Sequence, residues 1–168
     1  MIFDKLIRLL IPQLLAVLVI IISIQPLSIS GISNVMPMLE VVFIYYWGIR
    51  YPKVFPAWFV VLIGLLQDVL YGTPLGMTSF SNIVLLSMVI SQRKFLIKEP
   101  FWVQWGSFAL FSFIISVVKW VLALILLHTM EVSNIVWIQW LLTWAIYIFV
   151  HTLFDKIYKP FATNIPYA

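Results

Sequence analysis

Long apolar segments follow one another along almost the entire chain, with only short polar turns between them. A helix needs about 20 such residues to cross a membrane, at a rise of about 1.5 Å per residue. Of the 168 residues, 64% are hydrophobic and 10% are charged, whereas soluble domains average roughly 45–50% apolar and 25% charged residues. The sequence therefore predicts an all-α integral membrane protein that forms a single domain over residues 1–168, without a separate soluble core.

Six transmembrane helices are expected, packed as one compact bundle. Their approximate bounds are 6–29, 37–49, 56–71, 75–90, 101–127 and 135–154. The second helix is only about 20 Å long, so it must either pack deeply against protein or cross incompletely. The first segment has a rival interpretation as a cleaved signal peptide, because Ser28 and Ser30 are small. Its apolar run is longer than a typical signal core, which favours a membrane helix.

Basic residues lie at alternate ends of the expected helices. They are Lys5, Arg8, Arg50, Lys53, Arg93, Lys94, Lys98, Lys156 and Lys159, and the other three connections contain no Lys or Arg. Because positive residues collect on the cytoplasmic side of membrane proteins, both termini are predicted to be cytoplasmic. Topology thus accounts for the net charge of +4, and no nucleic-acid partner is expected.

Three ionisable side chains fall inside the expected spans, toward the outer side. Asp68 and Glu40 each lie about 5 Å from the outer end of their helix, and Lys119 lies about 12 Å below the outer end of its own. An unpaired charge at the membrane centre costs about 2.5–3.5 kcal/mol on insertion scales. We therefore expect Asp68 and Glu40 to face Lys119 in an outward-facing polar pocket. Four uncharged residues are expected to complete this pocket: Gln67, Thr78, Ser81 and Asn82. The alternative is that each charge reaches the outer headgroups by itself.

The segment GLLQDVLYGTPLG, at residues 64–76, joins one apolar helix to the next. Four of its residues share a helix face at i, i+3, i+4 and i+7: Gly64, Gln67, Asp68 and Tyr71. That polar face is expected to contact protein or a wet cavity rather than lipid. Three further residues are predicted to form a tight outer turn, since glycine permits positive φ and proline fixes the restart: Gly72, Pro74 and Gly76. A binding loop is the alternative for this segment.

Few residues suit catalysis or metal binding. The absence of cysteine excludes disulfides, thiol catalysis and thiolate metal sites. His128 and His151 are expected about 25–30 Å apart, too far to share a metal. His151 and Asp155, at i and i+4, could pair at the inner surface, but only as a solvated contact. No nucleophile motif or phosphate-binding loop is present. We predict no enzymatic activity, no cofactor and no metal site, and a proton relay through Glu40 and Asp68 is the remaining chemical alternative.

Three local motifs stand out by composition and spacing. They are Tyr46-Trp47-Gly48 with Pro52, Gly64-Leu65-Leu66-Gln67-Asp68, and Gly72-Thr73-Pro74-Leu75-Gly76. Together with six short-looped spans over essentially the whole chain, these motifs resemble the MreD family of rod shape-determining proteins.

This resemblance implies a non-enzymatic, multi-pass component of the cell-elongation machinery in the bacterial inner (cytoplasmic) membrane, where it regulates cell shape and supports peptidoglycan synthesis. The implied partners are MreC, the actin-like MreB, and RodA with its penicillin-binding transpeptidase, in addition to membrane lipid. The resemblance also implies a fold similar to the substrate-binding subunits of ECF transporters. In that fold, the pocket of Asp68 and Glu40 would be a ligand site or a docking site for MreC. The alternative function is therefore that of a substrate-binding membrane subunit of a vitamin-type transporter.

Overall fold

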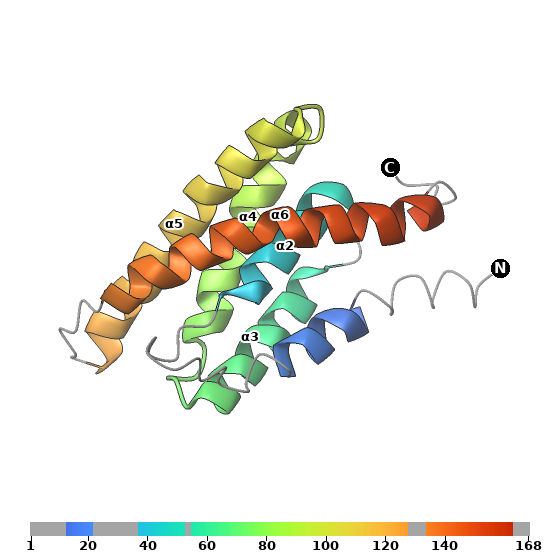
Figure 1. The fold of residues 1–168 in the computed structure, drawn as a ribbon. Coiled ribbons are helices and arrows are strands. Elements are labelled where there is room, and N and C mark those ends of the chain that lie inside the picture. The colour runs from blue at the N-terminus through green and yellow to red at the C-terminus, as the bar shows by residue number, and fades with distance from the viewer. Residues whose placement is uncertain (1–12, 22–36, 53–54, 128–133, 163–168) are drawn as a thin grey trace, which may run out of the picture.

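The structure, a computed structural model, describes residues 13–21, 37–52, 55–127 and 134–162 (Figure 1). The regular elements in these ranges are all helices: residues 13–21, α2 Leu39–Arg50, α3 Ala57–Tyr71, α4 Met77–Leu96, α5 Phe101–Leu127 and α6 Asn134–Ala162. The predicted all-α class is confirmed for this part of the chain. Residues 6–12 and 22–29 of the first predicted helix lie outside the described residues, and the single domain over 1–168 stays a prediction.

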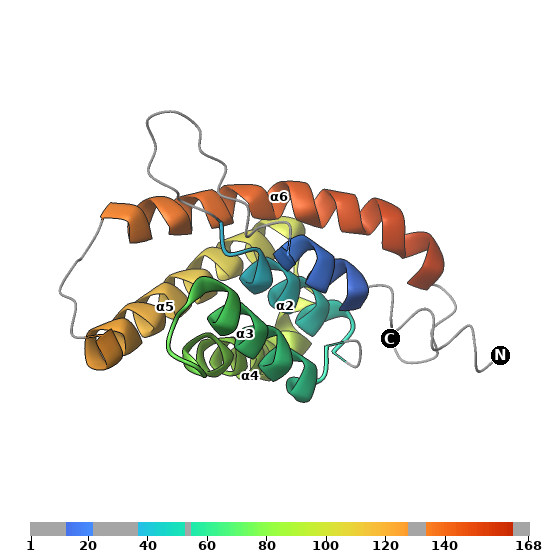
Figure 2. The ribbon, with the colours of Figure 1, turned by 90° about the horizontal axis from the view of Figure 1, so that it is seen from below.

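Helix α2 lies at the centre of the bundle, between α6 on one side and the α3–α4 pair on the other (Figure 2). All of its residues from Glu40 to Ile49 are buried. Aromatic rings fill the contacts around it, and the ring of Tyr45 meets those of Phe108 and Tyr147 at centroid distances of 5.1 and 5.6 Å. This burial agrees with the first of the two expectations for the short helix, that it packs deeply against protein.

Helices α3 and α4 form an antiparallel pair joined by the turn after Tyr71. They approach so closely at Gly64 that a Cβ there would lie 2.5 Å from the Cα of Ser79. Gly72 and Gly76 have φ angles of 66° and 93°, the left-handed conformation that glycine adopts without steric cost. Gly64, Gln67 and Asp68 are buried as expected for the polar face of α3, but Tyr71 is 47% exposed. Tyr71 is the last residue of α3, and its place on the polar face stays a prediction.

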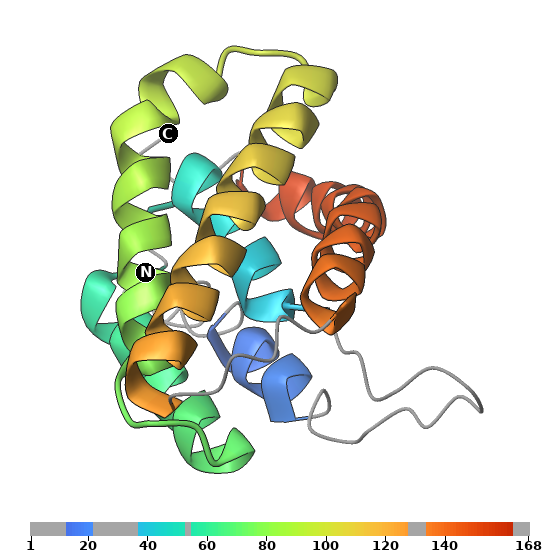
Figure 3. The same ribbon diagram turned by 90° about the vertical axis from the view of Figure 1, so that its left-hand side faces the viewer.

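Two predicted helix ends were placed too early. Helix α4 continues to Leu96 and α6 to Ala162, whereas ends near residues 90 and 154 were predicted. The basic residues after position 92 were assigned to a loop, yet Arg93 remains helical and its Nε donates a hydrogen bond to the carbonyl oxygen of Ile49, 2.7 Å away. Arg93 can therefore remain in α4, because the carbonyl oxygen of Ile49 near the end of α2 accepts a hydrogen bond from its side chain. Figure 3 shows α4 and the following α5 side by side.

Two helices in the described ranges are long and apolar enough to cross a membrane, α5 over Phe101–Leu126 and α6 over Val136–Lys156. Large apolar side chains also point away from the bundle on several helices, including Trp102 at 71% exposure and Phe149 at 77%. Exposed large apolar side chains on several helices suit a hydrocarbon environment. Six crossings and cytoplasmic termini remain predictions.

Candidate functional site

A buried ion pair joins the first turn of α2 to the middle of α5. The Nζ of Lys119 lies 2.8 Å from Oε1 of Glu40, and Glu40 is only 7% exposed. The same ammonium lies 3.8 Å from the sulfur of Met38. The backbone N–H of Met38 donates to Oγ1 of Thr143 on α6, at 2.9 Å. This small region therefore connects α2, α5 and α6 through polar contacts, and the carboxylate of Glu40 also lies favourably at a helix N-terminus.

Asp68, the other buried acid, has partners in the turn that follows it. Its carboxylate accepts hydrogen bonds from the Thr73 hydroxyl at 2.9 Å and from the backbone N–H groups of Gly76 and Thr78 at 2.8 and 3.1 Å. Asp68 is 1% exposed. The carboxylate thus binds the free N–H groups at the start of α4, where the helix dipole also favours a negative charge.

The predicted meeting of Asp68 and Glu40 around Lys119 is only half realised. Glu40 contacts Lys119, but all the hydrogen bonds described for Asp68 go to residues 73–78. The reason is local: a turn of a few residues brings three donors to Asp68, and no long-range partner is needed. The prediction that Asp68 faces Lys119 was therefore wrong.

The uncharged members of the predicted pocket are enclosed in the bundle. Gln67 is 3% exposed and Asn82 is fully buried. Oε1 of Gln67 and both amide atoms of Asn82 have no hydrogen-bond partner within the described residues. Ser81, by contrast, donates to the carbonyl oxygen of Met77 in its own helix, at 2.9 Å. Buried amide atoms without partners are unfavourable, so a bound water or another polar group would be most strongly held beside Gln67 and Asn82.

A second polar cluster lies where the C-terminal ends of α2 and α6 meet. Arg50 forms an ion pair with Asp155 at 3.2 Å, and the hydroxyl of Tyr46 donates to the same carboxylate at 3.0 Å. An Nη of Arg50 lies 3.2 Å from Nε2 of His151. Because a guanidinium only donates hydrogen bonds, that contact requires an unprotonated Nε2. The sequence indicated that His151 could form a solvated contact with Asp155, and the structure places Arg50 against both residues.

The sequence did contain a signal for this second cluster. Tyr46 with Arg50 and His151 with Asp155 are both i, i+4 pairs, which lie on one helix face. Both pairs also belong to helix ends predicted to lie on the same side of the membrane. Arg50 was explained by topology alone, so the two pairs were not combined.

The described residues contain no group of three His, Cys, Asp or Glu side chains placed to hold a metal ion. The two ion pairs described above connect α2 to its neighbours: Glu40 binds Lys119 on α5, and Arg50 binds Asp155 on α6.

Comparison with known proteins gives one match. The family model described as rod shape-determining protein MreD matches residues 3–157. Searches of curated proteins and of solved structures found no match, so the likeness to ECF transporter subunits stays a prediction. Since the family match spans nearly the whole chain and agrees with the motifs around Trp47, Asp68 and Pro74, this protein belongs to the MreD family of rod shape-determining proteins.

Proposed function

We propose that this protein is a non-enzymatic, multi-pass component of the bacterial cell-elongation complex in the inner membrane. Membership of the MreD family implies a role in determining rod shape. The finer proposal is that it supports peptidoglycan synthesis by binding MreC, and through MreC acts with MreB, RodA and the penicillin-binding transpeptidase.

One observation carries this proposal: the charged groups inside the bundle are engaged with each other or with backbone, while the outward helix faces are apolar. Glu40 binds Lys119, and Asp68 binds the start of α4. The exposed faces carry residues such as Phe80, Leu110 and Phe149. A protein with this distribution meets other membrane proteins by helix packing within the bilayer, as a scaffold does.

Six crossings with both termini in the cytoplasm are part of the proposal. Arg93 at the end of α4 donates to the carbonyl of Ile49 near the end of α2, and Arg50 pairs with Asp155 near the end of α6. Basic residues from the ends of α2 and α4 therefore lie beside the end of α6, on one side of the bundle. This gathering supports a common cytoplasmic side, as the positive-inside rule requires.

We also propose that the Glu40–Lys119 pair sets the arrangement of α2, α5 and α6 that partners recognise, with Gln67 and Asn82 as further polar members of this region. The vitamin-transporter alternative gains no specific support, because the Asp68 carboxylate is committed to the turn. Asp68 and the glycines of that turn, Gly72 and Gly76, thus have a structural role in this proposal.

The test uses a rod-shaped bacterium whose own MreD is depleted, so that cells become round. Production of this chain together with its cognate MreC is expected to restore rods, and detergent-solubilised protein is expected to co-purify with MreC. Lys119→Met is expected to reduce both effects. Lys94→Met is the matched control, since Lys94 is exposed at the opposite end of the bundle.

Restored rod shape without recovery of MreC in the purified complex would contradict the proposed partner. Saturable binding of a small metabolite by the purified protein, lost in Asp68→Ala, would instead favour the transporter alternative. Equal loss of function in Lys119→Met and Lys94→Met would show that general charge, not the buried pair, matters.

A further inference from the structure

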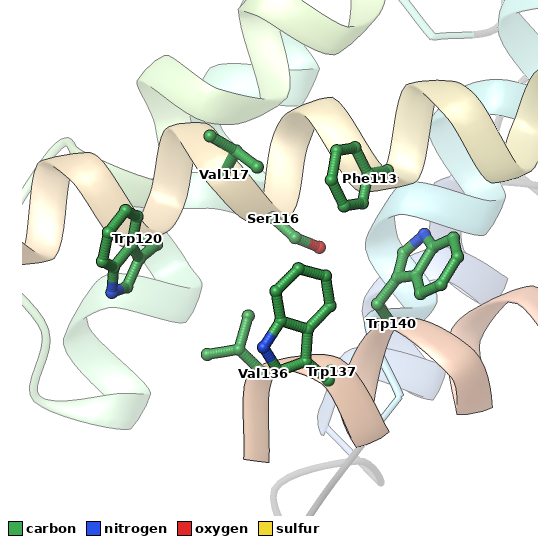
Figure 4. Close-up of a pocket in the computed structure, with 7 residues that line it drawn as sticks. All are labelled: Phe113, Ser116, Val117, Trp120, Val136, Trp137 and Trp140. Carbon is green, nitrogen blue, oxygen red and sulfur yellow. The ribbon is translucent and has the colours of Figure 1, made fainter. Parts of the chain in front are cut away.

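The two halves of α6 are held by different kinds of contact. Near the start of α6, Trp137 lines an apolar cavity together with Phe113 of α5 (Figure 4), and their ring centroids are 5.9 Å apart. Neither side chain titrates. In its C-terminal half, α6 meets α2 through three ionisable side chains instead, those of Arg50, His151 and Asp155. A change in pH can therefore act on the second half of α6 and leave the first half unchanged.

His151 is enclosed by side chains from three helices and is only 8% exposed. Its ring packs against three aromatic rings, from α2, α5 and α6 itself, at centroid distances of 5.7, 4.8 and 5.7 Å: Tyr46, Phe101 and Tyr147. The phenylalanine has no charge, and tyrosine is neutral at physiological pH. The charged groups beside His151 are therefore Arg50 on α2 and Asp155 on α6. Their side chains are 28% and 25% exposed, so water and protons reach the cluster.

The contact between His151 and Arg50 depends on the protonation state of the imidazole. An Nη of Arg50 lies 3.2 Å from Nε2 of His151, and a guanidinium only donates hydrogen bonds. Nε2 must then accept through its lone pair. A proton on Nε2 removes this acceptor and brings two positive charges together, so the contact is lost when His151 becomes charged.

Asp155 has a possible cationic partner on either helix. Its two carboxylate oxygens lie 3.2 and 3.3 Å from an Nη of Arg50, which makes an ion pair between α6 and α2. His151 precedes Asp155 by four residues on α6, a spacing at which opposite charges interact within one helix. A charged His151 would therefore compete with Arg50 for the carboxylate, and an ion pair within α6 would replace the one between the helices.

We propose that His151 makes the junction of α2 and α6 sensitive to pH: protonation moves Asp155 from Arg50 to His151 and releases the C-terminal half of α6 from α2. The end of α2 stays bound to α4, because Arg93 donates to the carbonyl oxygen of Ile49 at 2.7 Å. Helix α6 is thus the element that moves. This inference does not depend on the proposed contacts with MreC.

The experiment measures the distance between α4 and α6 by double electron–electron resonance on the full-length protein in lipid nanodiscs. The chain contains no cysteine, so nitroxide labels attach only at Lys94→Cys and Leu153→Cys, two exposed positions on these helices. Histidine changes its charge over the interval from about pH 8 to about pH 5.5. Over this interval, the population with a longer distance is expected to rise about tenfold.

His151→Gln tests the residue that carries the response. A glutamine carbonyl oxygen can accept from Arg50 and does not titrate, so the distance distribution of this variant is expected to be the same at both pH values. His128→Gln is the matched control, because His128 is the other histidine of the chain. It is expected to keep the wild-type response.

Asp155→Asn is an independent test if His151→Gln does not fold, as judged by circular dichroism. It removes the carboxylate that is exchanged, so its distribution at about pH 8 should resemble that of the wild type at about pH 5.5. The proposal is overturned if the wild-type distance does not change with pH, or if His151→Gln keeps the response. Loss of the response in His128→Gln, or a wild-type distance in Asp155→Asn at the higher pH, would also overturn it.

Discussion

Replacement of Lys119 by methionine tests the ion pair that connects α2 and α5. The ammonium of Lys119 is 2.8 Å from Glu40, and the two side chains are 19% and 9% exposed. Removing one partner of a buried pair leaves an uncompensated charge and typically costs about 3–5 kcal/mol. Because Lys119 is partly exposed, we expect the lower end of that range, about 3 kcal/mol.

The free-energy cost of Lys119→Met should depend on whether Glu40 is present. In a Glu40→Gln background no carboxylate is left without its partner, so Lys119→Met should cost less than about 1 kcal/mol. The coupling free energy between the two positions is therefore about 2 kcal/mol, within the range found for residues in direct contact. In an Asp68→Asn background the cost should stay at about 3 kcal/mol, because Asp68 binds the turn at residues 73–78 instead.

The assay is reversible denaturation of the purified protein in mixed micelles, followed by circular dichroism, with the wild type and the five single and double variants measured in parallel. Met is chosen because it preserves much of the length of the lysine side chain without its charge. An equal cost of Lys119→Met in the wild-type and Glu40→Gln backgrounds would refute the reasoning. Coupling to Asp68 as strong as that to Glu40 would show that all three groups share one site after all.

Three further variants test other contacts. Gly64→Ala should destabilise the protein by about 1–3 kcal/mol in thermal melts, because its Cβ would meet the α4 backbone, whereas Gly106→Ala, with open space around it, should not. Asp68→Asn should cost about 1.5–3 kcal/mol and speed amide exchange at the start of α4; unchanged exchange there would contradict the capping role. Arg50→Met should cost only about 1 kcal/mol, since its pair with Asp155 is partly exposed, and Lys94→Met should cost nothing measurable.

The ends of the helices show where sequence reasoning reached its limit. The apolar segments predicted α2, α3 and α5 within two residues at each described end. The end of α4 was placed several residues too early, because Arg93 was interpreted as a loop residue. Its hydrogen bond to Ile49, 44 positions away in the chain, is a tertiary contact that no local pattern contains.

The contacts of the candidate site were also predicted only in part. Glu40 and Lys119 were expected to meet because both charges fall in the outer half of the membrane, and the structure pairs them. Asp68 was expected to join them, but the adjacent turn satisfies it first. Arg50 was explained by membrane orientation, and its contacts with His151 and Asp155 were missed because they connect residues more than 100 positions apart.

The sequence by itself determined the helical class, the membrane character and the family, because each depends on the amount and spacing of apolar residues and on short local motifs such as the one from Gly64 to Gly76. Only the tertiary structure decided which buried charge binds which donor, and that α5 and α6 leave an apolar cavity between them. The physical reason is that a charge or an indole N–H is satisfied by whichever partner packing brings within about 3 Å, and packing is a property of the whole bundle.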